Sequence, residues 1–145
     1  MGELMELSRS ECETLLRRGV IGRAAIATPT GPQIVPLNYA VIGSSVVVCT
    51  TPDSMLGPYG RDSMLAFEID QFEHPRQRGW SVVVRGRADA VEDQEELRML
   101  ASTLARPWAA GRRSLYLRIP LTEVTGRRLG EGWDLEETLP VRRVF

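Results

Sequence analysis

Two polar residues, Asn38 and Tyr39, stand inside an apolar stretch of the chain, shortly after Pro36. A proline in a strand donates no backbone hydrogen bond, so we expect an interruption or a sheet edge at Pro36. Backbone polar groups beside such a gap are free to meet a ligand. Residues 34–42 therefore predict one wall of a binding site. The alternative is a polar interruption in an ordinary strand.

A group of hydroxyl side chains follows the next apolar run, at Thr50, Thr51 and Ser54. Hydroxyls and loop amides bind anions well, so this group predicts contact with a phosphate. The alternative is a strand end with turn-forming polar residues.

Charge composition limits the kinds of partner that the chain can bind. The net charge is -1 and all 18 basic residues are arginines. Near-neutral charge gives no field that would attract nucleic acid or a membrane surface. Without lysine, Schiff-base chemistry has no side-chain amine, and any cationic phosphate contact must come from arginine.

Other catalytic patterns are missing from the sequence. Glu68 and Asp70 fall on one side of a predicted strand, but without an acid-base partner they do not indicate a hydrolase. The single histidine, His74, has no partner for a metal site. Cys12 and Cys49 are expected to be buried and reduced. We find no Ser-His-Asp set and no glycine-rich nucleotide loop.

Local patterns predict the elements that position these residues. Ser8 and Glu11 have the spacing of a capping box, which predicts a helix that ends at Gly19. A second helix is expected from Asp93 to Pro107, and residues 54–59 can form at most a short helical turn. Apolar, β-branched runs predict strands at 23–28, 34–42, 46–51, 64–70, 80–91 (the longest), 115–119 and 123–129.

The order of these elements predicts the fold class. A meander of strands with few helices is typical of a mainly β (α+β) barrel and not of a doubly wound sheet. The 145 residues suit one domain, 1–145, with a core at about 7–129 and a tail at 130–145. An acidic N-terminus and the lack of a run of ~20 apolar residues predict a cytoplasmic location.

Six short blocks occur in an order that resembles a known family. The blocks are PLNYAV at 36–41, Thr50, FEID at 67–70, GWSVVVRG at 79–86, PWA at 107–109 and TGRRL at 125–129. Together they resemble the pyridoxamine 5′-phosphate oxidase-like flavin-binding proteins, in the small bacterial branch. The resemblance implies a split β-barrel of about six antiparallel strands with two main helices. It also implies a homodimer that binds FMN in a cleft shared by two subunits and acts as an oxidoreductase on a small molecule.

The resemblance also implies roles for individual residues. For Trp80 and Trp108, the alternative to the implied role is to anchor the core or an interface. The implied roles are Leu37, Asn38 and Tyr39 at the flavin ring; Thr50, Thr51 and Ser54 at the ribityl chain and phosphate; Trp80 and Ser81 beside the ring or its tail; Trp108 from the partner subunit; and Arg127 on the substrate side.

The chain departs from the family pattern where phosphate would bind. Cys49 and Met55 stand where cations are usual, and Asp53 stands where a small residue is usual. A charge-assisted contact contributes on the order of 1.5–3 kcal/mol, so losing two weakens binding roughly a hundredfold or more. Arg61, Arg85 or a partner's arginine could replace them. The alternative function is a non-catalytic split-barrel module that binds a deazaflavin, a haem-related molecule or a protein partner.

Overall fold

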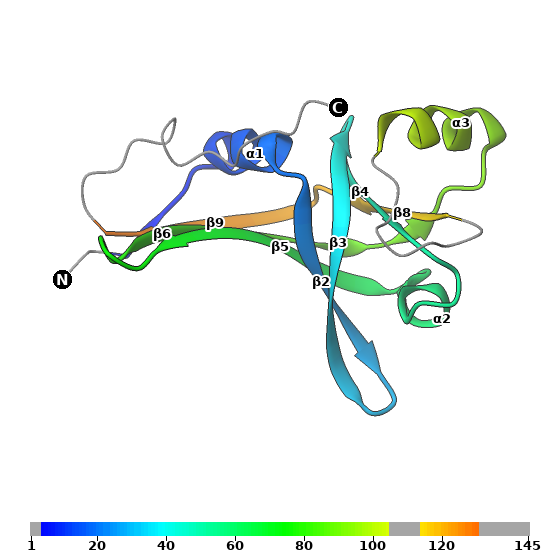
Figure 1. Ribbon diagram of the computed structural model, residues 1–145, viewed down its shortest axis with the longest axis horizontal. Coiled ribbons are helices and arrows are strands. Elements are labelled where there is room, and N and C mark those ends of the chain that lie inside the picture. Colours follow the sequence, from blue (N-terminus) through cyan, green and yellow to red (C-terminus); the bar gives the residue numbers. More distant parts are fainter. Residues whose placement is uncertain (1–3, 105–113, 131–145) are drawn as a thin grey trace.

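The computed structural model describes residues 4–104 and 114–130, which form one antiparallel sheet of nine strands with three helices (Figure 1). The order of neighbours in the sheet is β1-β9-β6-β5-β2-β3-β4-β8-β7. The elements are β1 Leu4–Glu6, α1 Arg9–Arg18, β2 Ile21–Thr28, β3 Gly31–Ile42, β4 Ser45–Thr50, α2 Leu56–Gly60, β5 Met64–Glu73, β6 Arg78–Arg87, β7 Asp89–Ala90, α3 Gln94–Thr103, β8 Leu115–Pro120 and β9 Glu123–Leu129. The mainly β class is confirmed, with nine strands in place of about six.

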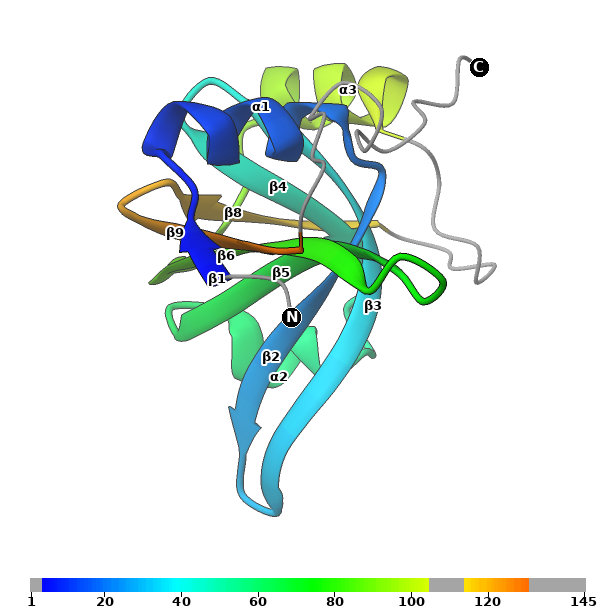
Figure 2. The same cartoon turned by 90° about the vertical axis from the view of Figure 1, so that its left-hand side faces the viewer.

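The sheet curls so that strands distant in its order meet. At Gly86 of β6, an added Cβ would lie 2.8 Å from the Pro120 carbonyl oxygen at the end of β8. The two strands therefore approach so closely that only a glycine fits. The β2–β3 hairpin projects away from α1 and α3 in both views (Figures 1 and 2). This curled sheet is the split barrel that the resemblance implied.

Helix α1 begins with the predicted capping box. The Ser8 hydroxyl accepts a hydrogen bond from the Glu11 N–H (3.1 Å), and the Glu11 carboxylate accepts one from the Ser8 N–H (3.0 Å). These bonds satisfy two backbone donors that a helix start otherwise leaves without partners. The apolar face of the helix then buries Cys12, Leu15 and Leu16 against the sheet.

Different helices pack against the two faces of the sheet. The main core lies on the inner face and includes the residues of α1 that face the sheet, together with Phe67, Trp80 and Leu117. On the opposite face, Leu100 and Leu104 near α3 pack over Val47, Cys49 and Tyr116. We use "outer face" for the part of this opposite face that α3 leaves uncovered. It includes Ile21, Arg23 and Ala25 on β2, Ile34 and Asn38 on β3, Glu68 and Asp70 on β5, Ser81, Val83, Arg85 and Arg87 on β6, Glu123, Thr125 and Arg127 on β9, and Glu6 on β1.

Pro36 does not interrupt its strand. It pairs with Arg23 of β2, whereas the pairing of β3 with β4 begins two residues later, at Asn38 opposite Cys49. The break that the proline predicted is therefore on the β4 side alone. With 12 residues, β3 is the longest strand.

Several predicted boundaries were wrong. The strand predicted at 80–91 is two strands, because β6 ends at Arg87 and the chain crosses to pair with β8 through β7. Strand β1 was not predicted, and its pairing with β9 comes from the far end of the described chain. Helix α3 ends at Thr103, before Pro107, since the Leu104 N–H bonds to the Leu100 carbonyl and the chain turns extended. Within the described residues no helix combines the length and apolar character needed to span a bilayer.

Candidate functional site

Asn38 lies where the cover of α3 over the sheet ends. Its neighbours on the same face are Cys49 of β4, which α3 covers, and Ile21 of β2, which is 42% exposed. The Asn38 side chain is only 9% exposed, and within the described part of the chain its amide has no hydrogen-bond partner. The amide atoms themselves still reach solvent, because within the described residues the shielded side-chain atoms without a partner are Glu68 Oε1 and Arg118 Nε. The amide is thus available to a ligand.

Ser81 and Arg127 lie on the same outer face as Asn38. Arg127 of β9 stands opposite Ser81 of β6, and Ser81 stands opposite Asp70 of β5. Cross-strand partners share a face of the sheet, so these side chains form a row that runs toward β2 and Asn38. The structure therefore brings three predicted site residues onto one surface.

The hydroxyl-bearing residues Thr50, Thr51 and Ser54 lie in a compact loop at the end of β4, which we call the hydroxyl loop. The Thr50 hydroxyl donates to the Ser54 hydroxyl (2.9 Å), and the Ser54 N–H bonds to the Thr51 carbonyl (3.0 Å). Gly57 holds the loop in place, because a Cβ there would lie 2.0 Å from the Pro52 carbonyl oxygen. The loop continues the strand that pairs with Asn38, so the predicted ring wall and phosphate loop are adjacent.

The charges of this loop suit a phosphate poorly. A hydrogen bond from the Thr51 side chain keeps the pKa of Asp53 below its usual value, so an anion stands in the loop. Burial raises the pKa of the Cys49 thiol, which stays neutral, and Met55 is 45% exposed. Arg61 is exposed just after α2 and is a cation close in sequence to the loop. The hydroxyls fit a phosphate, but the buried side of the loop supplies no cation.

Three predicted site residues have their side chains in the main core. Leu37, Tyr39 and Trp80 are at most 7% exposed and belong to the inner face. The Tyr39 hydroxyl donates to the Leu16 carbonyl at the end of α1 (2.7 Å), its ring meets Phe67 edge-on, and burial raises its pKa. Their side chains cannot reach a ligand on the outer face, and the Tyr39 N–H bonds to the Val20 carbonyl (3.0 Å), so only the surface of the strand at Leu37 and Tyr39 remains for a ligand. Trp80 fits its alternative role as a core anchor.

Trp108 lies outside the described residues. Cys12 and Cys49 are both buried and unpaired, as expected.

Arg23 is the partner that sequence reasoning missed for Glu68 and Asp70. Its guanidinium Nη1 lies 2.9 Å from Asp70 Oδ2 and 3.5 Å from Glu68 Oε1. A side-chain hydrogen bond with Asp70, followed by burial, raises the pKa of Glu68 to about 7. The alternation of β2 placed Arg23 on one face, but no local pattern indicates which strand lies beside it.

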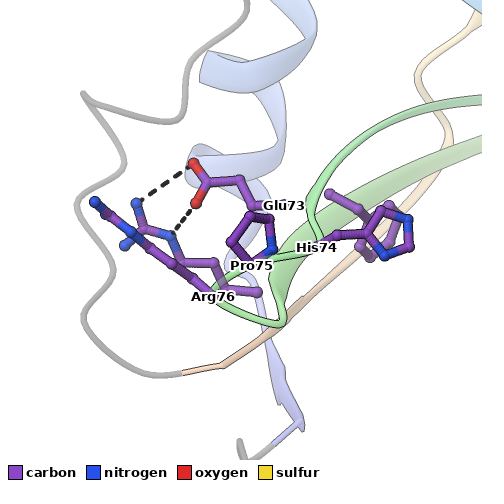
Figure 3. A pocket seen from close by; sticks show the side chains of 6 residues that line it. Glu73, His74, Pro75 and Arg76 are labelled. Atoms are coloured by element: carbon purple, nitrogen blue, oxygen red, sulfur yellow. Dashed lines mark hydrogen bonds and ion pairs between the residues drawn. The ribbon is translucent and has the colours of Figure 1, made fainter.

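A cavity of about 660 Å³ lies at the β5–β6 turn (Figure 3). Arg78, which is 6% exposed, donates to the Glu73 carboxylate from Nε (2.9 Å) and Nη2 (3.5 Å). None of the residues predicted to bind flavin is among the described residues that line it, so it is distinct from the site at Asn38. Its described lining is Phe72, Glu73, His74, Pro75, Arg76 and Arg78.

Known proteins resemble the chain in sequence and in structure. Residues 8–128 match the sequence model of a family described as pyridoxamine 5′-phosphate oxidase. An uncharacterised protein of Mycobacterium tuberculosis is 31% identical over 132 residues, which cover 88% of this chain and 86% of that protein. A solved FAD-binding protein of Mycobacterium smegmatis is 30% identical with a TM-score of 0.75, over 88% of this chain and 100% of that one. A FAD-binding protein of Mesorhizobium loti shares the fold, with 22% identity and a TM-score of 0.73 over 90% of this chain and 100% of that one. The chain therefore belongs to the pyridoxamine 5′-phosphate oxidase-like family.

Proposed function

We propose that the protein binds a flavin on its outer face beside Asn38 and acts as an oxidoreductase on a small molecule. The observation that carries this proposal is the Asn38 amide, which belongs to a largely buried residue and has no partner within the described residues. A flavin ring presents carbonyl and N–H groups along one edge, and these match an amide that can both donate and accept. Family membership and the FAD-binding relative support the same cofactor class.

The residues of the chain bind and orient in this proposal, while a bound flavin supplies the redox chemistry. Asn38 would bind the ring edge, and the backbone of Leu37 and Tyr39 would form the wall beside it. The hydroxyls of Thr50 and Ser54 would contact the ribityl chain. This division explains why the sequence lacks an acid-base catalytic pattern.

FMN is the form of flavin that we propose, with Arg61 as the nearby cation in sequence. Because Cys49 and Met55 replace two cations, we expect the ring and ribityl contacts to contribute more of the affinity than the phosphate does. FAD-binding relatives make FAD the form to compare with FMN directly.

The test is a titration of the purified protein with riboflavin, FMN and FAD, followed by flavin fluorescence. We expect a dissociation constant below about 100 μM for FMN. Weaker binding of all three flavins would overturn the proposal.

A substitution at Asn38 tests the proposed contact with the flavin directly. Asn38→Ala removes the amide, and loss of one hydrogen bond of about 1 kcal/mol or more should weaken flavin binding by roughly fivefold to tenfold. Gln33→Ala truncates another amide on β3, within the projecting hairpin, and serves as the matched control. Equal effects of both substitutions, or none from Asn38→Ala, would remove Asn38 from the site.

We also propose that two copies of the chain associate through the outer face. The support is the apolar character of that surface: Ile21 is 42% exposed, and Ile34, which stands opposite Ala25 further along β2, is 69% exposed. A second copy would cover these side chains and bring groups of its own to the flavin. The cytoplasmic location stays a prediction from the sequence.

The second candidate function is a non-catalytic split-barrel module. It is favoured by the ionised Asp53 and the neutral Cys49 around the hydroxyl loop, which oppose a phosphate. Such a module would bind a deazaflavin, a haem-related molecule or a protein partner. Binding of all three flavins weaker than about 100 μM would favour this candidate.

A further inference from the structure

Arg23, Glu68 and Asp70 form a compact cluster on the outer face. Arg23 stands opposite Glu68 in the pairing of β2 with β5, and Asp70 is two residues further along β5, on the same face. The single guanidinium approaches both carboxylates, at 2.9 Å from Asp70 Oδ2 and 3.5 Å from Glu68 Oε1. One cation thus faces two acids.

The two acids do not share this cation equally. Asp70 Oδ2 accepts a hydrogen bond from Arg23 Nη1, whereas Glu68 Oε1 is shielded from water and accepts none from the described residues. A shielded carboxylate oxygen without a donor is costly to keep ionised. A proton placed between the carboxyl groups removes this cost, because it turns one of two acceptors into a donor.

The surrounding side chains do not offer another cation to Glu68. On the β6 side, Val83 stands opposite Glu68 and Ser81 stands opposite Asp70. Arg85 of β6 is paired with Glu123 of β9 at 3.1 Å, and Arg127 of β9 lies one strand beyond Ser81. On the β2 side the facing charged group is Arg23 itself, with Pro36 of β3 beyond it.

We propose that Glu68 and Asp70 share one proton, and that this proton sets the charge of the face on which the flavin is proposed to lie. The pKa of Glu68, raised to about 7 by the hydrogen bond with Asp70 and by burial, supports sharing under physiological conditions. The second part of this inference rests on the proposed function.

This proton changes the net charge of the outer face by one unit. With the proton bound, four arginines, Arg23, Arg85, Arg87 and Arg127, stand with three ionised acids, Glu6, Asp70 and Glu123, so the face has an excess of one positive charge. When the proton leaves, four acids balance four arginines. An anionic ligand is therefore bound more tightly below the pKa of the pair than above it. Strand β5 is three strand spacings, about 14 Å, from β4, whose end carries the proposed phosphate loop. One unit charge at that distance from a phosphate of charge about -2 should change the affinity on the order of two- to fourfold.

The first experiment needs no flavin. Carboxyl carbon NMR of the ¹³C-labelled protein should show one Glu68 resonance that titrates near pH 7, far above the usual range of about 4. Asp70→Asn should return it toward that range, because an amide can donate to the ionised Glu68. Glu123→Gln, on the same face but in an exposed ion pair, should leave it unchanged. Titration of both Glu68 and Asp70 below about pH 5 would overturn the shared proton.

The second experiment tests the link to the ligand. Binding of FMN and of riboflavin is measured between pH 6 and pH 8 for the natural protein and for Glu68→Gln, which keeps the pair permanently neutral. We expect FMN affinity to fall by two- to fourfold more in the natural protein than in the variant, and riboflavin, which has no phosphate, to show no such difference. Identical FMN profiles would overturn the effect on the face.

The two experiments separate the possible failures. No binding of either flavin alongside a Glu68 titration near pH 7 contradicts the proposed function and keeps the shared proton. Flavin binding without that titration contradicts the shared proton and keeps the function.

Discussion

Adjacent residues of β3 point to opposite faces of the sheet and have different roles. Asn38 faces outward with an amide that lacks a partner in the described chain, and Tyr39 faces inward and bonds to the end of α1. The alternation of a strand explains the division, since successive side chains point to opposite faces. A ligand-binding residue can therefore lie directly beside a structural one, and substitutions at the two positions should have different effects.

Tyr39→Phe should reduce stability without touching the outer face. The change removes the donor to the buried Leu16 carbonyl, which keeps only the longer bond from the Gly19 N–H (3.4 Å), and loss of one such hydrogen bond costs about 0.5–1.5 kcal/mol. Urea unfolding should show the loss, with flavin affinity per folded molecule unchanged. Tyr59→Phe, at a ring that is 39% exposed, is the control and should have little effect. A loss of flavin affinity in the folded Tyr39 variant would place its hydroxyl in the site instead.

Glu68 should make stability depend on pH. Its pKa is raised in the folded protein from 4.5 to about 7, so between these values the folded state binds more protons than the unfolded state. The free energy of unfolding must then fall as pH rises through this window, by less than about 1.4 kcal/mol per pH unit. The side chain is 37% exposed, and solvent screening should limit the total loss to about 1–2 kcal/mol.

Urea unfolding at intervals from pH 4.5 to pH 8 measures this dependence. The relevant quantity is the difference between the natural protein and Glu68→Gln, because other carboxyl groups contribute equally to both. Parallel curves would show that Glu68 does not titrate in this window.

The geometry of some elements depends on contacts between residues that are close together in the sequence. The Ser8 and Glu11 bonds start α1, and the buried side of that helix closes the main core. The hydroxyl loop after β4 depends in a similar way on Gly57, which admits the Pro52 carbonyl. In both places a few neighbouring residues decide the geometry.

Ser8→Ala should lower stability by about 1 kcal/mol, since it removes the cap of α1. Ser10→Ala, within the same helix and exposed, is the matched control and should be neutral or slightly stabilising because alanine favours helices. Thermal unfolding of the two variants side by side is sufficient. Equal stability of both would mean that the capping bonds contribute little to the folded protein.

At the scale of the molecule, one uncovered face of the sheet is available for association. Half-buried Val83 stands between Glu68 and Thr125 in the middle of this outer face. Covering it with a second copy would bury apolar surface that one chain leaves in water.

Val83→Arg should therefore convert a dimer to a monomer. Sedimentation equilibrium of the natural protein should give twice the 16.2 kDa mass of the chain, and the variant should give the single mass. Met99→Arg, on the exposed side of α3, is the control and should remain dimeric. A monomeric natural protein, or a dimeric Val83 variant, would contradict association through this face.

Local patterns in the amino-acid sequence were sufficient to predict most elements and the class of fold. The capping box, the β-branched runs and the turn residues each act within a few positions, so the helices and most strands could be predicted from them. The ordered blocks from Pro36 to Leu129 also indicated the family. Segment ends were less certain, as in the predicted strand 80–91, because its crossing to β8 depends on a distant partner.

The folded structure was needed to show which side chains share a surface. It placed Arg23 beside Asp70, 47 positions away, and put Asn38, Ser81 and Arg127 on one face while Leu37, Tyr39 and Trp80 entered the core. The order of strands in a sheet is set by the free energy of burying the whole core, to which distant segments contribute together. No local pattern contains that sum, so the neighbours of each charged group could not be predicted from the sequence.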